Sequence, residues 1–135
     1  MGLPPRAVAL VDDLLFITKI QDACRRRGWE VVFATSRDSF LQQAQQGARL
    51  FLLDLHHRTV PPLEAAAQVK RDPVLGHWPM VGYYSHVHTE LRQEALAAGL
   101  DLVLPRSAFS AQLPGILDRF AAGLRPTPGE EEPQP

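Results

Sequence analysis

The sequence has one cysteine, almost no net charge and no long apolar run, and each shortage excludes a class of protein. Cys24 is the single cysteine among 135 residues, so no internal disulfide can form and a reducing cytoplasm is the expected setting. The formal net charge is −1, which gives no electrostatic reason to expect nucleic acid or an acidic membrane surface as a partner. No apolar run reaches the roughly 18 residues of a membrane-spanning helix.

A glycine-rich phosphate loop is missing as well. The first apolar run leads into an acidic stretch beginning at Asp12, which argues against a flavin- or nucleotide-binding protein. With 45% hydrophobic residues, the chain does have enough apolar material for the core of one domain. We expect a domain over residues 1–123 and a disordered tail, rich in Pro and Glu, over 124–135.

Short apolar runs rich in β-forming residues alternate with longer segments of helical spacing. The runs lie at 7–11, 29–34, 50–53, 79–84 and 101–104. In the segments between and after them, apolar residues recur every three or four positions, as on one face of a helix. Five strands alternating with five helices predict a doubly wound α/β domain, with a parallel sheet covered by helices on both faces.

Local signals place several helix ends. Gly28 is expected to end the first helix, and Ser36 to cap the second. Pro114 lies inside the last amphipathic segment, and we place it within the first turn or so of that helix, where its missing N–H costs little. Cys24 falls on the inward face of the first helix and is expected in the core.

Carboxylates follow two of the apolar runs. Asp12 and Asp13 close Ala-Val-Ala-Leu-Val, and Asp54 closes Leu-Phe-Leu-Leu. Strands that are apolar on both faces usually lie in the middle of a parallel sheet, and ligands bind where such strands end. Two carboxylates suit a Mg²⁺ site, and Asp54 suits attack on a phosphoryl group. Ser85 and Arg106, at the ends of the last two strands, are placed to bind phosphoryl oxygens.

Several short motifs follow one another at spacings that are typical of a single protein family. In chain order they are Leu-Val-Asp12-Asp13, Leu-Leu-Asp54, Tyr83-Tyr84-Ser85, and Ala98-Gly99-Leu100-Asp101 followed by Leu104-Pro105-Arg106. Over residues 6–122 the chain thereby resembles the receiver domain of two-component response regulators. The resemblance implies a five-stranded parallel sheet in the flavodoxin-like order 2-1-3-4-5 with five helices. It also implies a signalling module rather than an enzyme.

The resemblance assigns a role to each candidate residue. Asp54 becomes the phosphoacceptor, Ser85 the switch hydroxyl, and Arg106 stands in place of the usual lysine. The implied ligands of a Mg²⁺ cofactor are three carboxylates and one backbone carbonyl, from Asp12, Asp13, Asp54 and His56.

Partners follow from the same resemblance. A histidine kinase or a phosphotransfer protein would supply the phosphoryl group in the cytoplasm. Since no DNA-binding segment follows, we expect the output to pass to a downstream protein partner, without direct contact to nucleic acid or membrane. A homodimer through the fourth helix, fifth strand and fifth helix is compatible with the family.

Departures from the family pattern keep a second hypothesis open, a pseudo-receiver that binds proteins without being phosphorylated. Arg106-Ser107 replaces the family's Lys-Pro with its cis peptide bond, and we expect a trans bond because Ser107 is not proline. His86 follows Ser85 where a small residue is usual, and so would crowd the pocket. Val103 stands where an inward-turning aromatic is expected on the fifth strand.

Histidines gather at the ends of two neighbouring strands. They are His56, His57, His86 and His88. Because no fixed ligand spacing is evident, we interpret them as parts of polar loops rather than as a transition-metal site.

Overall fold

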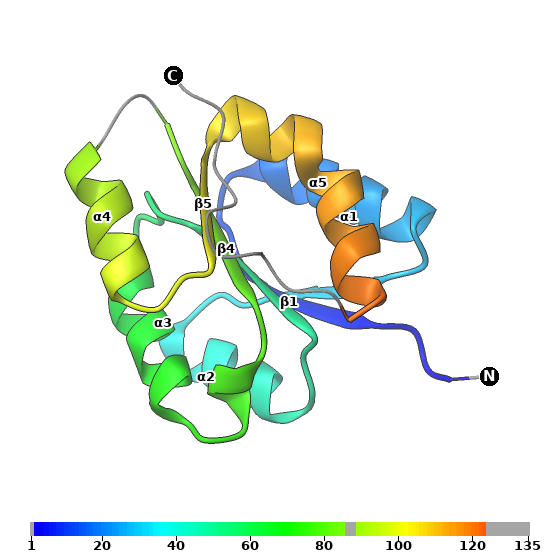
Figure 1. Cartoon of the computed structure of the whole chain (residues 1–135), viewed down its shortest axis with the longest axis horizontal. Helices are drawn as coiled ribbons and strands as arrows, with labels where there is room; N and C mark the ends of the chain where they lie inside the picture. The colour runs from blue at the N-terminus through cyan, green and yellow to red at the C-terminus, as the bar shows by residue number, and fades with distance from the viewer. Residues whose placement is uncertain (1, 86–88, 124–135) are drawn as a thin grey trace.

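A central parallel sheet lies between two layers of helices in this computed structural model, which describes residues 2–85 and 89–123 (Figure 1). The strands are β1 (Arg6–Leu10), β2 (Glu30–Phe33), β3 (Leu50–Asp54), β4 (Met80–Tyr84) and β5 (Leu102–Pro105). The helices are α1 (Leu14–Arg26), α2 (Arg37–Gln45), α3 (Pro62–Arg71), α4 (Thr89–Ala97) and α5 (Arg106–Ala121), with a short 3-10 helix at Leu75–His77.

The strands pair in the order β2-β1-β3-β4-β5, and every pairing is parallel. This confirms the doubly wound, flavodoxin-like α/β fold that the sequence and the resemblance predicted. The central strand β3 ends at Asp54, whose register partner on β4 is Tyr83. Because paired residues of neighbouring strands point to the same face, both side chains face the layer formed by α1 and α5.

Each face of the sheet carries its own apolar core. On one face, β-strand residues pack with α1 and α5, and on the other they pack with α2, α3 and α4 (Figure 1). Cys24 is fully buried in the first of these cores, as predicted, and burial raises the pKa of its thiol to about 11. The thiol is therefore a packing group in this structure.

Local chemistry explains where the first two helices begin and end. The Asp13 carboxylate caps α1 by accepting from the backbone N–H groups of Leu15 and Phe16, at 2.8 and 3.2 Å. Ser36 caps α2, as predicted. After α1 the backbone reverses at Gly28 with φ of 76°, a conformation that favours glycine.

The last helix differs from the prediction. Helix α5 starts at Arg106, immediately after β5, so Pro114 lies in its middle rather than in its first turn. The sequence placed the start too late, because apolar periodicity becomes visible only from Phe109 onward. None of the described peptide bonds is cis, so the Arg106–Ser107 bond is trans, as expected. None of the described helices has the length and hydropathy needed to cross a membrane.

Candidate functional site

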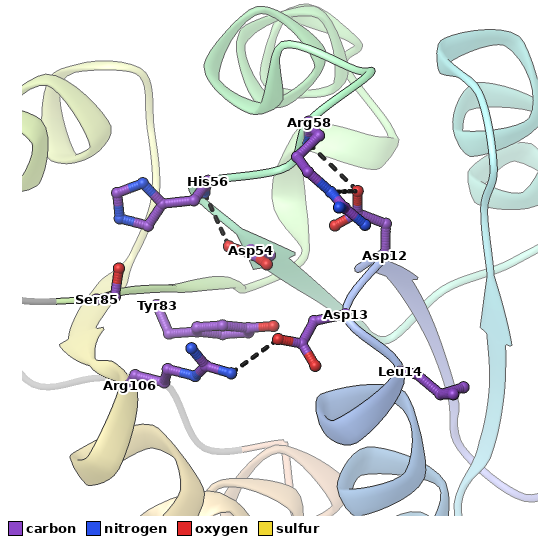
Figure 2. Close-up of a pocket in the computed structure, with 9 residues that line it drawn as sticks. All are labelled: Asp12, Asp13, Leu14, Asp54, His56, Arg58, Tyr83, Ser85 and Arg106. Carbon is purple, nitrogen blue, oxygen red and sulfur yellow. Dashed lines mark hydrogen bonds and ion pairs between the residues drawn. The ribbon is translucent and has the colours of Figure 1, made fainter.

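The carboxyl ends of β1, β3, β4 and β5 surround a cavity of about 440 Å³ at one edge of the sheet (Figure 2). It is lined by the six residues that the sequence indicated, Asp12, Asp13, Asp54, His56, Ser85 and Arg106. Leu14, Arg58 and Tyr83, which the sequence did not indicate, line it as well. The structure therefore brings all the candidates together, while their individual roles remain predictions.

Asp54 lies at the floor of the cavity and is only 7% exposed. Its Oδ1 atom accepts a hydrogen bond of 2.8 Å from the backbone N–H of His56, which fixes the orientation of the carboxylate. Burial raises the pKa of Asp54 above its usual value, and the charge of Asp12 adds to this. The His56 N–H and the charges of His56 and His57 act in the opposite direction. Asp54 is thus a desolvated carboxyl group whose charge depends on nearby donors.

Asp12 faces an arginine. Its Oδ2 atom accepts from Nε of Arg58 at 3.2 Å and from the backbone N–H of the same residue at 3.4 Å. Burial opposes the effect, yet these hydrogen bonds hold the pKa of Asp12 below its usual value. The Arg58 side chain is 79% exposed, so the ion pair is screened by water and contributes little to stability.

Asp13 faces a second arginine while it caps α1. Nη2 of Arg106 donates to Oδ2 of Asp13 at 2.8 Å. The Arg106 guanidinium also lies over the Phe16 ring, with 4.5 Å between Cζ and the ring centroid. Two of the three predicted metal-binding carboxylates are therefore engaged by arginines in this structure.

Tyr83 is the buried aromatic residue of the site. Its ring stacks between those of Phe16 and Phe109, at centroid distances of 4.8 and 4.6 Å. The residue is 2% exposed, and its hydroxyl makes no well-formed hydrogen bond within the described part of the chain, although it interacts weakly with the Asp54 side chain. Burial, followed by the negative charges of Asp54 and Asp13 and by the weak hydrogen-bonding interaction with Asp54, raises the pKa of the phenol far above its usual value. The hydroxyl therefore keeps its proton and acts through hydrogen bonds, either donating one or accepting one from another group.

The histidines divide between the cavity and its surroundings. His56 lines the cavity, and Figure 2 shows its ring on the same side as the Ser85 hydroxyl. His57 is buried beneath the loop, where Nδ1 accepts from the backbone N–H groups of Thr59 and Val60 at 3.3 and 3.1 Å. His86 and His88 lie outside the described residues, so the expected crowding by His86 stays a prediction.

The donor set can be compared with the needs of Mg²⁺. Three carboxylates and the His56 carbonyl are hard oxygen donors, and Mg²⁺ typically takes one or two carboxylates and completes its shell with water and phosphate. Over residues 2–85 and 89–123, however, no three His, Cys, Asp or Glu side chains are grouped closely enough to hold a metal ion. The chemistry of these donors fits Mg²⁺. In this structure, however, Asp12 and Asp13 form ion pairs with arginines.

Sequence reasoning missed Arg58 and Tyr83. Arg58 carried no signal, because its contact with Asp12 depends on the path of the loop after β3. The sequence offers a weak signal for Tyr83, because this residue lies two positions before Ser85, at the end of the strand that pairs with the strand of Asp54. Only the register of β3 against β4 shows that the Tyr83 side chain shares a face with Asp54.

The sheet order and the acidic cavity at the carboxyl edge define the class of fold: it is that of response-regulator receiver domains. No protein-family model and no curated protein matches the chain. Among solved structures, the chemotaxis response regulator CheY4 of Vibrio cholerae matches with a TM-score of 0.75 at 19% identity, over 87% of this chain and 98% of that one.

Two further structures give the same picture. A CheY-like receiver domain protein of Methanospirillum hungatei matches with a TM-score of 0.76 at 15% identity, over 89% of this chain and 95% of that one. The receiver domain of the sensor histidine kinase PA1611 of Pseudomonas aeruginosa matches with a TM-score of 0.76 at 18% identity, over 88% of this chain and 98% of that one. That domain has magnesium coordinated in its active-site cleft. At such identities the likeness shows the fold.

Proposed function

We propose that this chain is the receiver domain of a two-component phosphorelay and that Asp54 accepts the phosphoryl group. The observation that carries the proposal is the position of Asp54, a buried carboxylate at the end of the central strand, in one cavity with Asp12, Asp13, Ser85 and Arg106. Solved receiver domains with the same fold support it. The chain acts as a signalling module in the cytoplasm rather than as an enzyme.

The transfer step needs a positioned nucleophile. The His56 N–H orients the Asp54 carboxylate, and a carboxylate oxygen then attacks the phosphorus of a phosphohistidine on a kinase or phosphotransfer protein. A new P–O bond forms as the donor's P–N bond breaks, and the leaving imidazole nitrogen keeps the electron pair and takes up a proton. Asp12 and Asp13 would hold Mg²⁺, with Asp54 and the His56 carbonyl, to supply positive charge beside the phosphoryl oxygens.

The signal to a partner depends on donor side chains that move toward the phosphoryl group once it is attached to Asp54. Ser85 donates a hydrogen bond to one phosphoryl oxygen. Arg106 leaves Asp13 and donates to another phosphoryl oxygen instead. Because Arg106 is the first residue of α5, this exchange alters the surface formed by α4, β5 and α5. A downstream protein partner, or a second copy of the chain, reads that surface.

The first prediction concerns the phosphoacceptor. Incubation with acetyl phosphate and Mg²⁺ adds the mass of one phosphoryl group to the wild-type chain, as read by intact mass spectrometry. Asp54→Asn adds none, because the amide keeps the shape of the side chain but is not a nucleophile. Absence of labelling in the wild type, under conditions that label a typical receiver, contradicts the proposal, and so does equal labelling of the variant.

A second candidate function is favoured by the two arginines. Arg58 on Asp12 and Arg106 on Asp13 balance the charges of these two acids in the way that a metal would. A chain that keeps this state permanently is a pseudo-receiver, a protein-binding module that needs neither Mg²⁺ nor phosphorylation. The two candidates differ in whether a cation can replace the arginines.

The second prediction decides between them. Calorimetry detects Mg²⁺ binding to the wild type, and Asp13→Asn weakens it roughly tenfold or more because the site loses one anionic ligand. Asparagine is chosen because it still caps α1. Asp22→Asn is the matched control, since Asp22 lies on α1 with Arg25 and Arg26 and does not line the cavity. No Mg²⁺ binding to the wild type favours the pseudo-receiver.

A further inference from the structure

The Tyr83 hydroxyl is a donor inside the acidic cavity for which packing gives no explanation. Tyr83 lines the cavity with Asp13 and Asp54, and its hydroxyl makes no well-formed hydrogen bond to the described residues, only a weak interaction with the Asp54 side chain. Figure 2 shows the ring lying between Asp54 and Arg106, with the hydroxyl pointing toward the Asp13 carboxylate. Buried polar groups normally have partners, and an unpartnered one calls for a reason.

We propose that Tyr83 is a phosphoryl-binding residue, whose hydroxyl donates a hydrogen bond to the group carried by Asp54. The inference rests on the proposed function and adds to it a donor beyond Ser85 and Arg106. No covalent bond changes at Tyr83, because the hydroxyl keeps its proton and contributes only a hydrogen bond to a negatively charged oxygen.

The position of the hydroxyl is fixed by the elements around it. Tyr83 is the register partner of Asp54 on the neighbouring strand, so the two side chains leave the sheet side by side on the same face. The ring is held by stacking on Phe16 from α1 and on Phe109 from α5. A donor on a ring held in this way loses little conformational freedom when it binds charge that develops beside Asp54.

A purely structural role does not account for the hydroxyl. The two flanking members of the stack are phenylalanines, and a third phenylalanine at position 83 would complete the same packing. In the resting state the hydroxyl is desolvated and its weak interaction with Asp54 is not a well-formed hydrogen bond, which lowers stability relative to phenylalanine. The other strong donors on the cavity wall are already engaged, Arg106 with Asp13 and Arg58 with Asp12. Tyr83 is a donor that gains a well-formed hydrogen bond when the phosphoryl group arrives.

The chain itself offers a clean spectroscopic test. It contains two tyrosines, Tyr83 and Tyr84, which are neighbours on β4 and pack in different cores. With isotope-labelled tyrosine, the ring carbon that bears the hydroxyl gives one NMR signal per residue, assigned with Tyr84→Phe. Addition of Mg²⁺ and beryllofluoride, a mimic of the aspartyl phosphoryl group, shifts the Tyr83 signal while the Tyr84 signal moves less.

Binding of the mimic gives the second readout. Tyr83→Phe keeps the aromatic stack and binds beryllofluoride about tenfold more weakly, the loss expected for one hydrogen bond to a charged group. Its melting temperature without ligand equals or exceeds that of the wild type, which a structural hydroxyl would not allow. Tyr84→Phe is the matched control and binds the mimic as the wild type does.

The outcomes separate this inference from the function on which it rests. If the wild type binds the mimic in an Asp54-dependent way, while the Tyr83 signal stays in place and Tyr83→Phe binds equally well, the inference is wrong and the phosphoacceptor stands. A Tyr83→Phe variant that melts well below the wild type also contradicts it, because the hydroxyl would then have a structural partner. If the wild type binds no mimic, both the proposed function and this inference fail.

Discussion

At the scale of single residues, the site is a set of acids whose charges are balanced by different means. The charges of Asp12 and Asp13 are balanced by arginines. Asp54 has no such ion pair among the described residues; it is buried and accepts a hydrogen bond from the backbone N–H of His56. An ion pair and a single backbone hydrogen bond do not compensate desolvation equally. The pKa of Asp12 is lowered and that of Asp54 is raised, which makes Asp54 the acid that destabilises the resting fold.

The third prediction follows from the sign of this shift. A carboxyl group whose pKa is raised on folding binds its proton more tightly in the folded state, so its charged form lowers the free energy of unfolding. That cost is absent below the ordinary pKa of 3.8 and grows as pH rises through the raised pKa of the folded state. Asp54→Asn is therefore more stable than the wild type at neutral pH, and the difference shrinks in acid.

Chemical denaturation at several pH values, with a chelator present, measures the difference. Asp12→Asn is the control, because the pKa of Asp12 is lowered in the folded state and its charged form raises the free energy of unfolding. This replacement therefore destabilises the protein, most of all at neutral pH. A constant difference between Asp54→Asn and the wild type from acid to neutral pH would show that burial does not perturb Asp54.

At the scale of elements, the junction of β5 and α5 determines how Arg106 enters the site. The strand ends at Pro105 and the helix begins at the next residue, so the guanidinium leaves from the first turn of α5 toward Asp13. Because α5 begins this early, Pro114 lies in its interior. Proline has no N–H, so the carbonyl of Ser110 lacks its usual hydrogen bond within the helix. Helix α5 therefore contains an internal weak point, at a position that lines a groove with α1.

The fourth prediction tests that weak point. Pro114→Ala supplies the missing N–H and raises the free energy of unfolding by about 2 kcal/mol, the helix-interior cost of proline less its effect on the unfolded chain. Pro62→Ala is the matched control, because Pro62 lies at the start of α3 where proline is well tolerated. Urea unfolding measures both, and an unchanged or reduced stability of Pro114→Ala contradicts the prediction.

At the scale of the whole molecule, the sequence predicted the architecture well and the electrostatics of the site poorly. Apolar runs alternating with amphipathic segments predicted the α/β class, and the positions of Asp12, Asp13 and Asp54 placed acids at one sheet edge. The pairing of Asp12 with Arg58 could not be predicted, because it depends on a loop path. Likewise, the placement of Tyr83 beside Asp54 depends on strand register, which local patterns do not fix.

The two tryptophans give the fold a built-in optical reporter. Both precede strands, Trp29 ahead of β2 and Trp78 ahead of β4, so they lie at the amino-terminal edge of the sheet, opposite the cavity. The indole N–H of buried Trp29 donates to the carbonyl of Leu117 on α5 at 3.1 Å. A change in emission when the cavity is filled would consequently record motion carried through the body of the domain, and not quenching by the occupant itself.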